Sequence, residues 1–294
     1  MTPRVSIGLP FGDNLDTLGL AIRSVFAQTE TDWELLLADD GSVDGSRALA
    51  ASIADPRVRL LGDRNRRGLA VRLNQIARAA RAPVIARMDA DDQMAPDRLA
   101  TQLAVLEADP ALDLVGSDLV ALDAAGRPTG RRKRRALPND LAGVLRHGFL
   151  SHPTVVGRRA WFLANPYGEC WSRGEDFELW CRAVGRVRVG EVPEPLLFYR
   201  EPVPVNLPAY LTTFRARRAI TLRYGPATIG WLPTAALVVR TLVQPLAYRI
   251  ARRCGLEHRL VARRNRPLDA RERREAEAVL GRIAATPLPL RSDR

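Results

Sequence analysis

Three aspartates stand close together after a short apolar run in the first third of the chain. Residues 84–86, Val-Ile-Ala, are typical of a buried strand, and Asp89, Asp91 and Asp92 follow directly in the segment 87–92. Sheets of alternating strands and helices bind ligands at the carboxyl ends of their strands. Carboxylate oxygens are also the ligands that Mg2+ and Mn2+ prefer, and such a cation can bridge the oxygens of a diphosphate. We therefore predict a metal and nucleotide-diphosphate site here, although an isolated Asp-x-Asp also occurs in solvated turns.

Two further strand ends are predicted at the same edge. The first strand runs into Pro10 and Phe11, and the second runs into Asp40 within the sequence Asp-Asp-Gly-Ser at residues 39–42. A carboxylate at this position can accept a hydrogen bond from a pyrimidine ring N–H, and Phe11 can offer a flat apolar surface to a base. The alternative is that residues 39–46 form a helix-capping turn, and the two interpretations are compatible.

Strand and helix patterns alternate in the segment that leads to the aspartates. Apolar runs predict strands over residues 4–9, 34–38, 58–61 and 84–88, and apolar residues at helical spacing separate them. This alternation indicates an α/β fold with a mainly parallel central sheet flanked by helices. Beyond it the sequence predicts a helix that starts at Pro96, a strand over residues 114–122, and further strands and helices from residue 154.

A run of basic residues interrupts this pattern. Residues 131–135 read Arg-Arg-Lys-Arg-Arg, which is too charged for a core, so we expect residues 126–135 to form a mobile surface loop. Two interpretations stay open: the loop is only solvated, or it lies near an anionic acceptor.

Most of the positive charge lies in the last third of the chain. The 294 residues have a formal net charge of +12, but residues 1–200 contain 27 Lys and Arg against 26 Asp and Glu, whereas residues 201–294 contain 18 against seven. The three cysteines have neither metal-ligand spacing nor a disulfide pattern, and residues 1–7 lead into strand-like sequence without a signal segment. We therefore expect a cytoplasmic protein with a substantial core.

An ordered set of motifs carries a family resemblance. They are Ser-Val-Phe-Ala-Gln-Thr at 24–29, the segment 33–42, Asn-Arg-Arg-Gly-Leu-Ala at 65–70, the segment 85–92, Pro-Asp-Arg-Leu at 96–99, His-Pro-Thr-Val at 152–155, Gly-Glu-Asp-Phe-Glu-Leu-Trp at 174–180 and Leu-Leu-Phe-Tyr-Arg at 196–200. In these motifs the chain resembles the family 2 glycosyltransferases over residues 4 to about 200. The resemblance implies a GT-A fold and the transfer of a sugar from a nucleotide-sugar with inversion at the anomeric carbon.

The resemblance implies a donor pocket at the first strand ends. Pro10, Phe11 and Asp40 would hold the nucleotide base, and Arg67 and Asn74 are further candidates along the pocket. The expected donor is a nucleotide-diphospho-sugar, with a UDP-sugar favoured.

The same resemblance assigns roles to five carboxylates. Asp89 would approach the ribose or the metal, Asp91 would bind Mn2+ or Mg2+ directly, and Asp92 would support the site. Asp176 would be the general base that deprotonates the acceptor hydroxyl, and the adjacent Glu175 could raise its proton affinity. Acidic residues also stabilise the start of any helix, which is the simpler interpretation of this pair.

Two positions depart from the family pattern. Relatives often have Asn where Gly12 stands, and often His two residues beyond the Tyr-Arg pair, where this chain has Glu201-Pro202. His152 and Trp180 are candidates on the acceptor side, although a structural role for His152 beside Pro153 is an equal alternative.

Residues 203–294 are predicted to form a basic, partly amphipathic helical extension. The apolar stretch 229–239 is too short to span a bilayer, which needs about 20 residues. With Trp231, Tyr248 and the arginines that follow, residues 226–266 fit a peripheral contact with anionic lipid, and a helical lid packed on the catalytic part is the alternative. Residues 284–294 resemble a frayed terminus.

We thus expect a catalytic domain over residues 1–202, with a nucleotide-binding half at 1–122 and an acceptor half at 123–202, followed by the extension at 203–294. The expected activity is inverting transfer of a sugar to a hydroxyl of a glycan or lipid-linked acceptor. A non-catalytic binding or scaffold relative and a sugar nucleotidyltransferase are the alternatives, and the latter should have a Gly-rich triphosphate loop that residues 8–16 lack. No nucleic-acid partner is expected, because the basic tail lacks interleaved aromatic residues.

Overall fold

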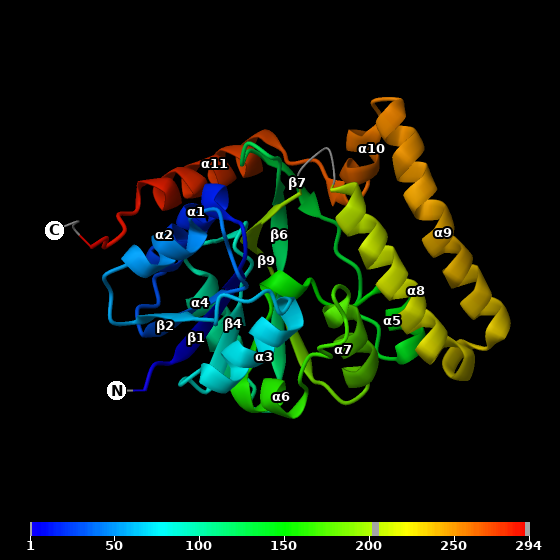
Figure 1. The fold of residues 1–294 in the computed structure, drawn as a ribbon, viewed down its shortest axis with the longest axis horizontal. Coiled ribbons are helices and arrows are strands. Elements are labelled where there is room, and N and C mark those ends of the chain that lie inside the picture. Colours follow the sequence, from blue (N-terminus) through cyan, green and yellow to red (C-terminus); the bar gives the residue numbers. More distant parts are fainter. Residues whose placement is uncertain (1, 202–205, 292–294) are drawn as a thin grey trace.

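The computed structural model describes residues 2–201 and 206–291 and consists of one twisted sheet with helices on both faces (Figure 1). The main path of the sheet has the strand order β10-β7-β6-β8-β4-β1-β2-β3, and β9 pairs with both β5 and β6. Two clusters of buried apolar residues fill the space between the sheet and the helices. Leu35 and Leu37 belong to one cluster and Leu36 and Ala38 to the other, because successive strand residues point to opposite faces.

The segment that leads to the three aspartates has the predicted parallel arrangement. Its strands are β1 (Val5–Phe11), β2 (Trp33–Asp39), β3 (Val58–Leu61) and β4 (Val84–Arg87), and all the pairs among them are parallel. The intervening helices are α1 (Leu15–Phe26), α2 (Ser46–Ser52) and α3 (Leu69–Ala79). Gly8 of β1 allows α3 to pack closely, because a Cβ there would lie 2.5 Å from Ile76 Cγ2.

The segment from residue 93 to residue 200 makes the sheet mixed. It contains β5 (Gln93–Met94), α4 (Arg98–Ala108), β6 (Leu114–Leu122), β7 (Pro128–Arg132), α5 (Leu141–His147), the 3-10 turn η1 (His152–Thr154), β8 (Val156–Arg158), α6 (Arg159–Ala164), α7 (Glu175–Ala183) and β9 (Val189–Arg200). β8 is antiparallel to both β4 and β6, whereas β6 and β9 are parallel. The α/β fold is therefore confirmed, with the parallel part confined to β1–β4 and the β6–β9 pair.

The expectation of a mobile surface loop over residues 126–135 is wrong for most of that segment. Residues 128–132 form β7, which lies between β6 and β10 in the sheet. The charged side chains are accommodated because Arg131 pairs with Asp118 at 2.7 Å and Arg132 pairs with Glu201 at 2.8 Å. The charge of these residues predicted a solvated loop, but the carboxylates of Asp118 and Glu201 pair with Arg131 and Arg132 in the sheet.

The C-terminal extension is helical, as predicted. It contains α8 (Leu207–Ile229), α9 (Trp231–Arg253), α10 (Glu257–Ala262), β10 (Asn265–Arg266) and α11 (Ala270–Ala285). α8 packs on α5 and α7, α9 packs on the outside of α8, and α11 crosses the molecule to lie against α1 (Figure 1). The predicted domain boundary at residues 202–203, and the Pro202 that stands in place of the family's His, lie outside the described residues.

The end of the chain is not frayed as far as residue 291. The N–H of Ala54 donates to the carbonyl of Pro289 at 2.5 Å, and the N–H of Arg291 donates to the carbonyl of Ser52 at 2.8 Å. Residues 292–294 lie outside the described part of the chain. The short backbone pairing with residues 52–54 was invisible to the sequence because its partner is more than 230 residues away.

Within residues 2–201 and 206–291, no helix combines the length and apolar character needed to cross a membrane.

Candidate functional site

The carboxyl ends of β1, β2 and β4 meet, as their sequence predicted. Phe11 is aligned with Asp39 across the β1–β2 pair, and Gly8 is aligned with Arg87 across the β1–β4 pair. The chain leaves the sheet at these points, so the residues that follow, Asp40 and Asp89, line one edge. The N–H of Asp40 donates to the carbonyl of Phe11 at 2.7 Å, which fixes the turn after β2.

The three aspartates after β4 form one cluster. Carboxylate oxygens of Asp89, Asp91 and Asp92 all lie within 4.8 Å of one another. Arg87 Nη1 donates to Asp89 Oδ2 at 2.6 Å, and the N–H of Arg200 donates to Asp92 Oδ1 at 3.0 Å. Asp92 Oδ2 is buried and has no hydrogen-bond partner within the described chain.

The electrostatics of this cluster favour a bound cation. Burial, followed by the charge of Asp89, raises the pKa of Asp91 to about 6. Burial and the charges of Asp91 and Asp89 also raise the pKa of Asp92. Like charges in a partly desolvated site repel one another, and a divalent cation with oxygen ligands would remove that repulsion. The orphaned Asp92 oxygen and the all-oxygen donor set therefore fit Mg2+ or Mn2+.

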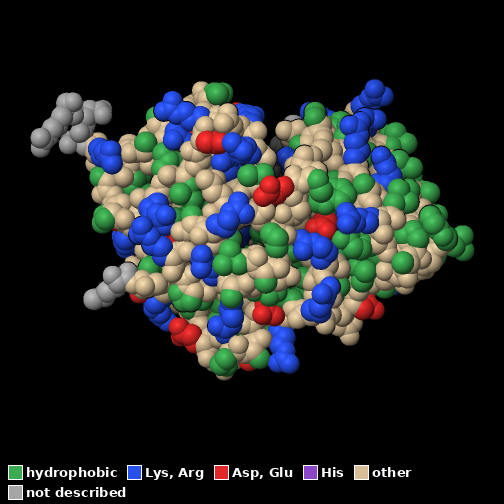
Figure 2. Space-filling view, turned by 60° about the horizontal axis from the view of Figure 1, so that its bottom comes forward, with side chains coloured by type: hydrophobic (Ala, Val, Ile, Leu, Met, Phe, Trp, Pro, Cys, Tyr) green, Lys and Arg blue, Asp and Glu red, His purple; other side chains and the backbone are tan. Residues whose placement is uncertain are grey.

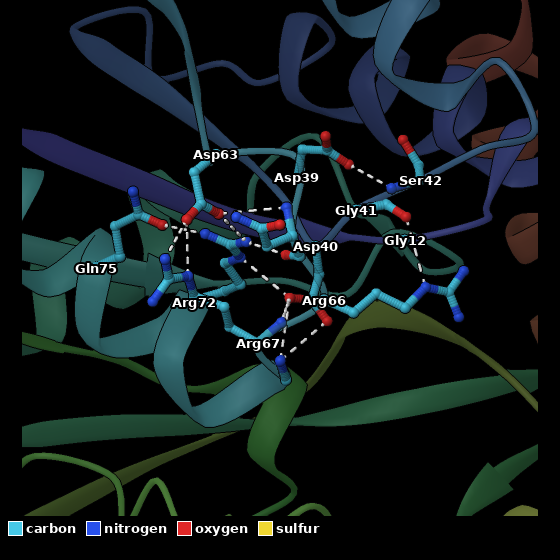
Figure 3. A network of polar contacts seen from close by, with 12 residues as sticks. Gly12, Asp39, Asp40, Gly41, Ser42, Asp63, Arg66, Arg67, Arg72 and Gln75 are labelled. Atoms are coloured by element: carbon cyan, nitrogen blue, oxygen red, sulfur yellow. Dashed lines mark hydrogen bonds and ion pairs between the residues drawn. The ribbon is translucent and has the colours of Figure 1, made fainter.

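Asp40 is the centre of a polar network at the end of β2 (Figure 3). Its Oδ1 accepts hydrogen bonds from the N–H groups of Arg67 at 2.8 Å and Gly68 at 3.0 Å, and from Arg72 Nε at 3.1 Å. Its Oδ2 accepts only the shared Gly68 N–H, at 3.1 Å, among the described residues. The Asp40 side chain is 23% exposed, so Oδ2 keeps acceptor capacity for a ligand N–H.

Arg72 holds this network together, and sequence reasoning missed it. It projects from α3 with a side chain only 2% exposed and also binds Asp63 Oδ1 at 2.9 Å. Asp63 pairs in turn with Arg67, and hydrogen bonds from Arg67 and Arg72 lower the pKa of Asp63. Arg67, a predicted donor-pocket residue, thus contacts Asp40 through its backbone and Asp63 through its guanidinium group.

Three predicted donor-side residues are buried. Pro10 lies within β1, and the Phe11 ring is 3% exposed and belongs to the hydrophobic core. Asn74 Nδ2 donates to the carbonyl of Tyr167 at 2.9 Å, and its Oδ1 accepts from the Tyr167 N–H at the same distance. Asn74 therefore anchors the segment before α7, whereas Asp40 and Arg67 lie at the surface of the turn region.

Glu175 and Asp176 begin α7, after Gly174 with a φ of +77°. Glu175 is buried, whereas Asp176 is partly exposed. Burial, followed by the charge of Asp176, raises the pKa of Glu175 to about 7. Burial raises the pKa of Asp176 as well, although its Oδ1 accepts the Phe177 N–H at 2.7 Å. The accessible member of the pair is thus the one predicted as general base.

Arg87 acts electrostatically on both the acidic pair and the aspartate cluster. Arg87 is 4% exposed and stabilises the charged forms of Asp91, Glu175 and Asp176. Arg217 of α8 also stabilises the Asp176 carboxylate and lies over the Phe177 ring, 4.4 Å from its centroid. Two buried or half-buried arginines thus sit among the carboxylates.

The acceptor-side candidates are buried packing residues. His152 Nε2 lies 2.8 Å from the Tyr167 hydroxyl, and burial and Arg87 lower the pKa of this histidine. The Trp180 ring is 1% exposed and stacks on Trp161. Both residues are packed in the interior rather than presenting an open surface.

The missed residues gave weak local signals. Arg72 and Arg87 are single arginines in apolar segments, which is the pattern of a buried cation, but the partner carboxylates can be named only from the fold. Arg200 was part of a recognised motif, yet its contact with Asp92 requires β9 to cross the sheet beside β6.

A solved structure with the same fold is the mannosyltransferase PcManGT from Pyrobaculum calidifontis, in complex with GDP-Man and Mn2+. It has a TM-score of 0.58 and 18% sequence identity to this chain, and the match covers 97% of this chain and 86% of that one. This likeness confirms the GT-A type of fold, a mixed sheet flanked by helices.

Curated relatives match over shorter segments. EpsE from Bacillus subtilis is 32% identical over 188 residues, which cover 61% of this chain and 66% of EpsE. WfgD from Escherichia coli, named as a UDP-Glc:alpha-D-GlcNAc-diphosphoundecaprenol beta-1,3-glucosyltransferase, is 33% identical over 102 residues, which cover 35% of this chain and 40% of WfgD. The matched part thus spans less than two thirds of either relative.

The family described as Glycosyl transferase family 2 matches residues 6–163, which is more than half of the chain and includes both the Asp40 turn and the aspartate cluster. The chain therefore belongs to glycosyl transferase family 2.

Proposed function

We propose that the protein transfers a sugar from a nucleotide-diphospho-sugar to a hydroxyl group, with inversion at the anomeric carbon. One observation carries this proposal: the buried Arg87 binds Asp89 of the aspartate cluster at 2.6 Å and also stabilises the charged forms of Glu175 and Asp176. A site with a cation-binding group for the diphosphate and a separate accessible carboxylate has the two functions that a single displacement needs.

The donor base is expected at Asp40. Its Oδ2 can accept the ring N–H of a uracil, while Arg72 and two backbone N–H groups hold Oδ1 in place. WfgD is named as an enzyme that uses UDP-Glc as donor, which favours a UDP-sugar for this chain as well. PcManGT binds GDP-Man, so a guanine donor belongs in any test.

Asp91 and Asp89 would hold Mn2+ or Mg2+, with Asp92 supporting them from its buried position. When bound, the cation supplies positive charge to the departing diphosphate. The protein contributes Arg87, which fixes Asp89, and the Arg200 N–H, which fixes Asp92. These contacts orient the carboxylates before a ligand arrives.

Asp176 would take the proton from the acceptor hydroxyl. Such a base contributes typically ~10²- to 10⁴-fold in rate, and its raised pKa strengthens it as a proton acceptor. Glu175 is buried, and the charge of Asp176 raises its pKa. A base on the side opposite the leaving group gives one displacement and hence inversion.

The acceptor is proposed to be a glycan attached through a diphosphate to a lipid. WfgD is named for such an acceptor, alpha-D-GlcNAc-diphosphoundecaprenol. His152 and Trp180 would serve this acceptor indirectly, by shaping the wall that positions α7.

The exposed face of α9 is proposed to contact the cytoplasmic surface of the cell membrane. Figure 2 shows hydrophobic side chains gathered at the right edge of the molecule, where α9 lies. At least half of each of the following side chains is exposed: Trp231, Leu232, Val239, Leu242, Val243, Leu246 and Ile250. Exposed arginines at 249, 252 and 253 lie at the C-terminal end of the helix and complement anionic lipid.

A panel of nucleotide-sugars tests the proposal. We expect the wild type to bind one UDP-sugar in Mn2+ or Mg2+ and to lose that binding in EDTA, with the same loss in Asp91→Asn. Asp97→Asn, an exposed aspartate six residues further on, is the matched control and should bind like the wild type. Failure to bind any donor under any metal condition would overturn the proposal.

A further inference from the structure

A basic cavity of about 290 Å³ lies beside the catalytic region. Its walls are β6, the segment that continues β7 through residues 132–138, the segment 147–151 between α5 and η1, and Arg264 from the C-terminal extension. β10, which follows Arg264 in the chain, pairs with β7 at this place. Neither the donor nor the metal site uses these residues.

Cations outnumber acids in the cavity wall. The lining includes five cations, Arg132, Lys133, Arg134, Arg135 and Arg264, against two acids, Asp118 and Glu191. Asp118 is already shared between Arg131 at 2.7 Å and Arg134 at 3.6 Å.

Two of these cations have no carboxylate partner. Within residues 2–201 and 206–291, neither Lys133 nor Arg135 forms an ion pair, and Lys133 Nζ donates only to the carbonyl of Arg263, at 3.0 Å. A concave surface with unpaired cations concentrates the field that attracts an anion.

The cavity adjoins the catalytic groups on two sides. Phe149 of the wall lies against the Trp180 ring of α7, with centroids 5.5 Å apart, and Ser151 precedes His152. On the other side Arg132 lies over Tyr199, 5.7 Å from its ring centroid, and the next residue, Arg200, binds Asp92. A ligand group in the cavity would thus lie near α7, through the contact of Phe149 with Trp180, and near the aspartate cluster, through Arg132, Tyr199 and Arg200.

We propose that this cavity binds the diphosphate through which the acceptor glycan is attached to its lipid. The inference rests on the proposed function and names the residues that recognise the acceptor. A cavity of this size is at the small end of ligand sites, so it suits a compact charged group rather than a whole lipid-linked glycan. Arginine and lysine are the side chains that bind phosphate oxygens most strongly.

The position of the cavity also fits a lipid carrier. Arg264 Nη2 donates to the Tyr248 hydroxyl of α9 at 2.8 Å, so the cavity adjoins the helix whose exposed apolar face is proposed to contact the membrane. The diphosphate of a lipid-linked sugar lies at the membrane surface, and the sugar nearest to it would be the one that reaches Asp176. We therefore infer that the acceptor hydroxyl belongs to a sugar close to the lipid.

Binding of three probes to the full chain tests this inference. The probes are inorganic diphosphate in EDTA, neutral phosphatidylcholine vesicles containing farnesyl diphosphate, and vesicles containing phosphatidylglycerol. The cavity variant is Lys133→Gln with Arg135→Gln, both exposed residues, and the control is Arg274→Gln with Arg282→Gln on the exposed face of α11. Both variants lose the same charge, and thermal unfolding checks that each is folded.

The expected result is a loss of about tenfold or more in affinity for inorganic diphosphate and for farnesyl diphosphate vesicles in the cavity variant alone, since two charge-assisted contacts are removed. Binding to phosphatidylglycerol should fall equally in both variants. The inference would be overturned if the wild type did not bind inorganic diphosphate, or if the wild type and both variants bound it equally. It would also be overturned if the cavity variant lost affinity only for phosphatidylglycerol vesicles. A third contradiction would be a cavity variant that loses affinity for inorganic diphosphate but not for farnesyl diphosphate vesicles.

Because EDTA removes the metal, the diphosphate measurement does not depend on the donor site. Failure of the wild type to bind any nucleotide-sugar would count against the proposed function, and failure of the diphosphate arm would count against the cavity.

Discussion

Glu175 and Asp176 are neighbours in the chain but differ in access to solvent. Glu175 is buried with a pKa raised to about 7, and Asp176 is partly exposed with a raised pKa of its own. When two carboxylates share a site, the charge of one raises the proton affinity of the other. The protonation of Glu175 therefore depends on the charge of Asp176.

Replacing Glu175 by Gln should leave the acidic limb of the pH–rate profile in place. The charge of Asp176 raises the pKa of Glu175, so Asp176 ionises first and Glu175 is neutral while Asp176 titrates. The measurement is the rate of donor turnover across pH, with Glu194→Gln, an exposed glutamate on β9, as control. An acidic limb that moves to lower pH in Glu175→Gln would show instead that Glu175 is ionised while Asp176 titrates.

At the residue scale the sequence offered more candidates among the acidic groups than among the cations. Asp40, Asp91 and Asp176 could be named because each follows or begins a recognisable element. Arg72, which binds both Asp40 and Asp63, could not be assigned, because its partners come from different strand ends that only the folded sheet brings together. Phe11 shows the reverse case, since its position at a strand end suggested a binding surface and its ring is in the core.

At the scale of elements, α9 differs from every helix that covers the sheet. It packs on α8 and α10, and the opposite face exposes leucines and valines. The sequence suggested a membrane contact or, as the alternative, a helical lid packed on the catalytic part, and the packing of α8 fits the lid. α8 packs on α5 and α7, whereas α9 is left with an apolar surface.

Leu242→Gln should weaken binding to phosphatidylglycerol vesicles by about fivefold. The Leu242 side chain is 54% exposed, and losing the burial of about half a leucine costs about 1 kcal/mol of binding free energy. The measurement is vesicle sedimentation at low and high salt. Leu163→Gln, at a 42% exposed leucine on α6, is the matched control and should bind like the wild type.

Equal binding by Leu242→Gln, Leu163→Gln and the wild type would mean that α9 does not enter the membrane surface. High salt should weaken binding by all three proteins, since the arginines at the end of α9 act through charge.

At the scale of the whole molecule, the C-terminal helix α11 packs against α1 near the start of the chain. Alternating patterns predicted the parallel strands β1 to β4, because local periodicity is enough to define them. The antiparallel pairs of β8, the inclusion of β7 and the crossing of α11 depend on contacts between distant segments, which one sequence does not reveal. The basic run at residues 131–135 was misread for this reason.

Ile283→Ala should lower the free energy of unfolding of the whole chain by about 2–5 kcal/mol. Ile283 of α11 is 0% exposed and belongs to the same buried cluster as Ile7 and Leu35 of the central sheet. Loss of a buried isoleucine side chain leaves a cavity in that shared core. Denaturant unfolding followed by fluorescence and by circular dichroism is the measurement, and Ala285→Gly, at the exposed end of α11, is the control for helix ends.

A separate low-stability transition for the C-terminal part, with the main transition unchanged in Ile283→Ala, would show that α11 is an independent appendage.

The most direct test of the account compares Asp176→Asn with the wild type in donor binding and in turnover. The account predicts unchanged affinity for the donor in Mn2+, because Asp40 and the aspartate cluster are intact, together with transfer slowed ~10²- to 10⁴-fold through loss of the base. Wild-type rates of transfer in Asp176→Asn, at equal donor occupancy, would contradict the central claim that Asp176 deprotonates the acceptor.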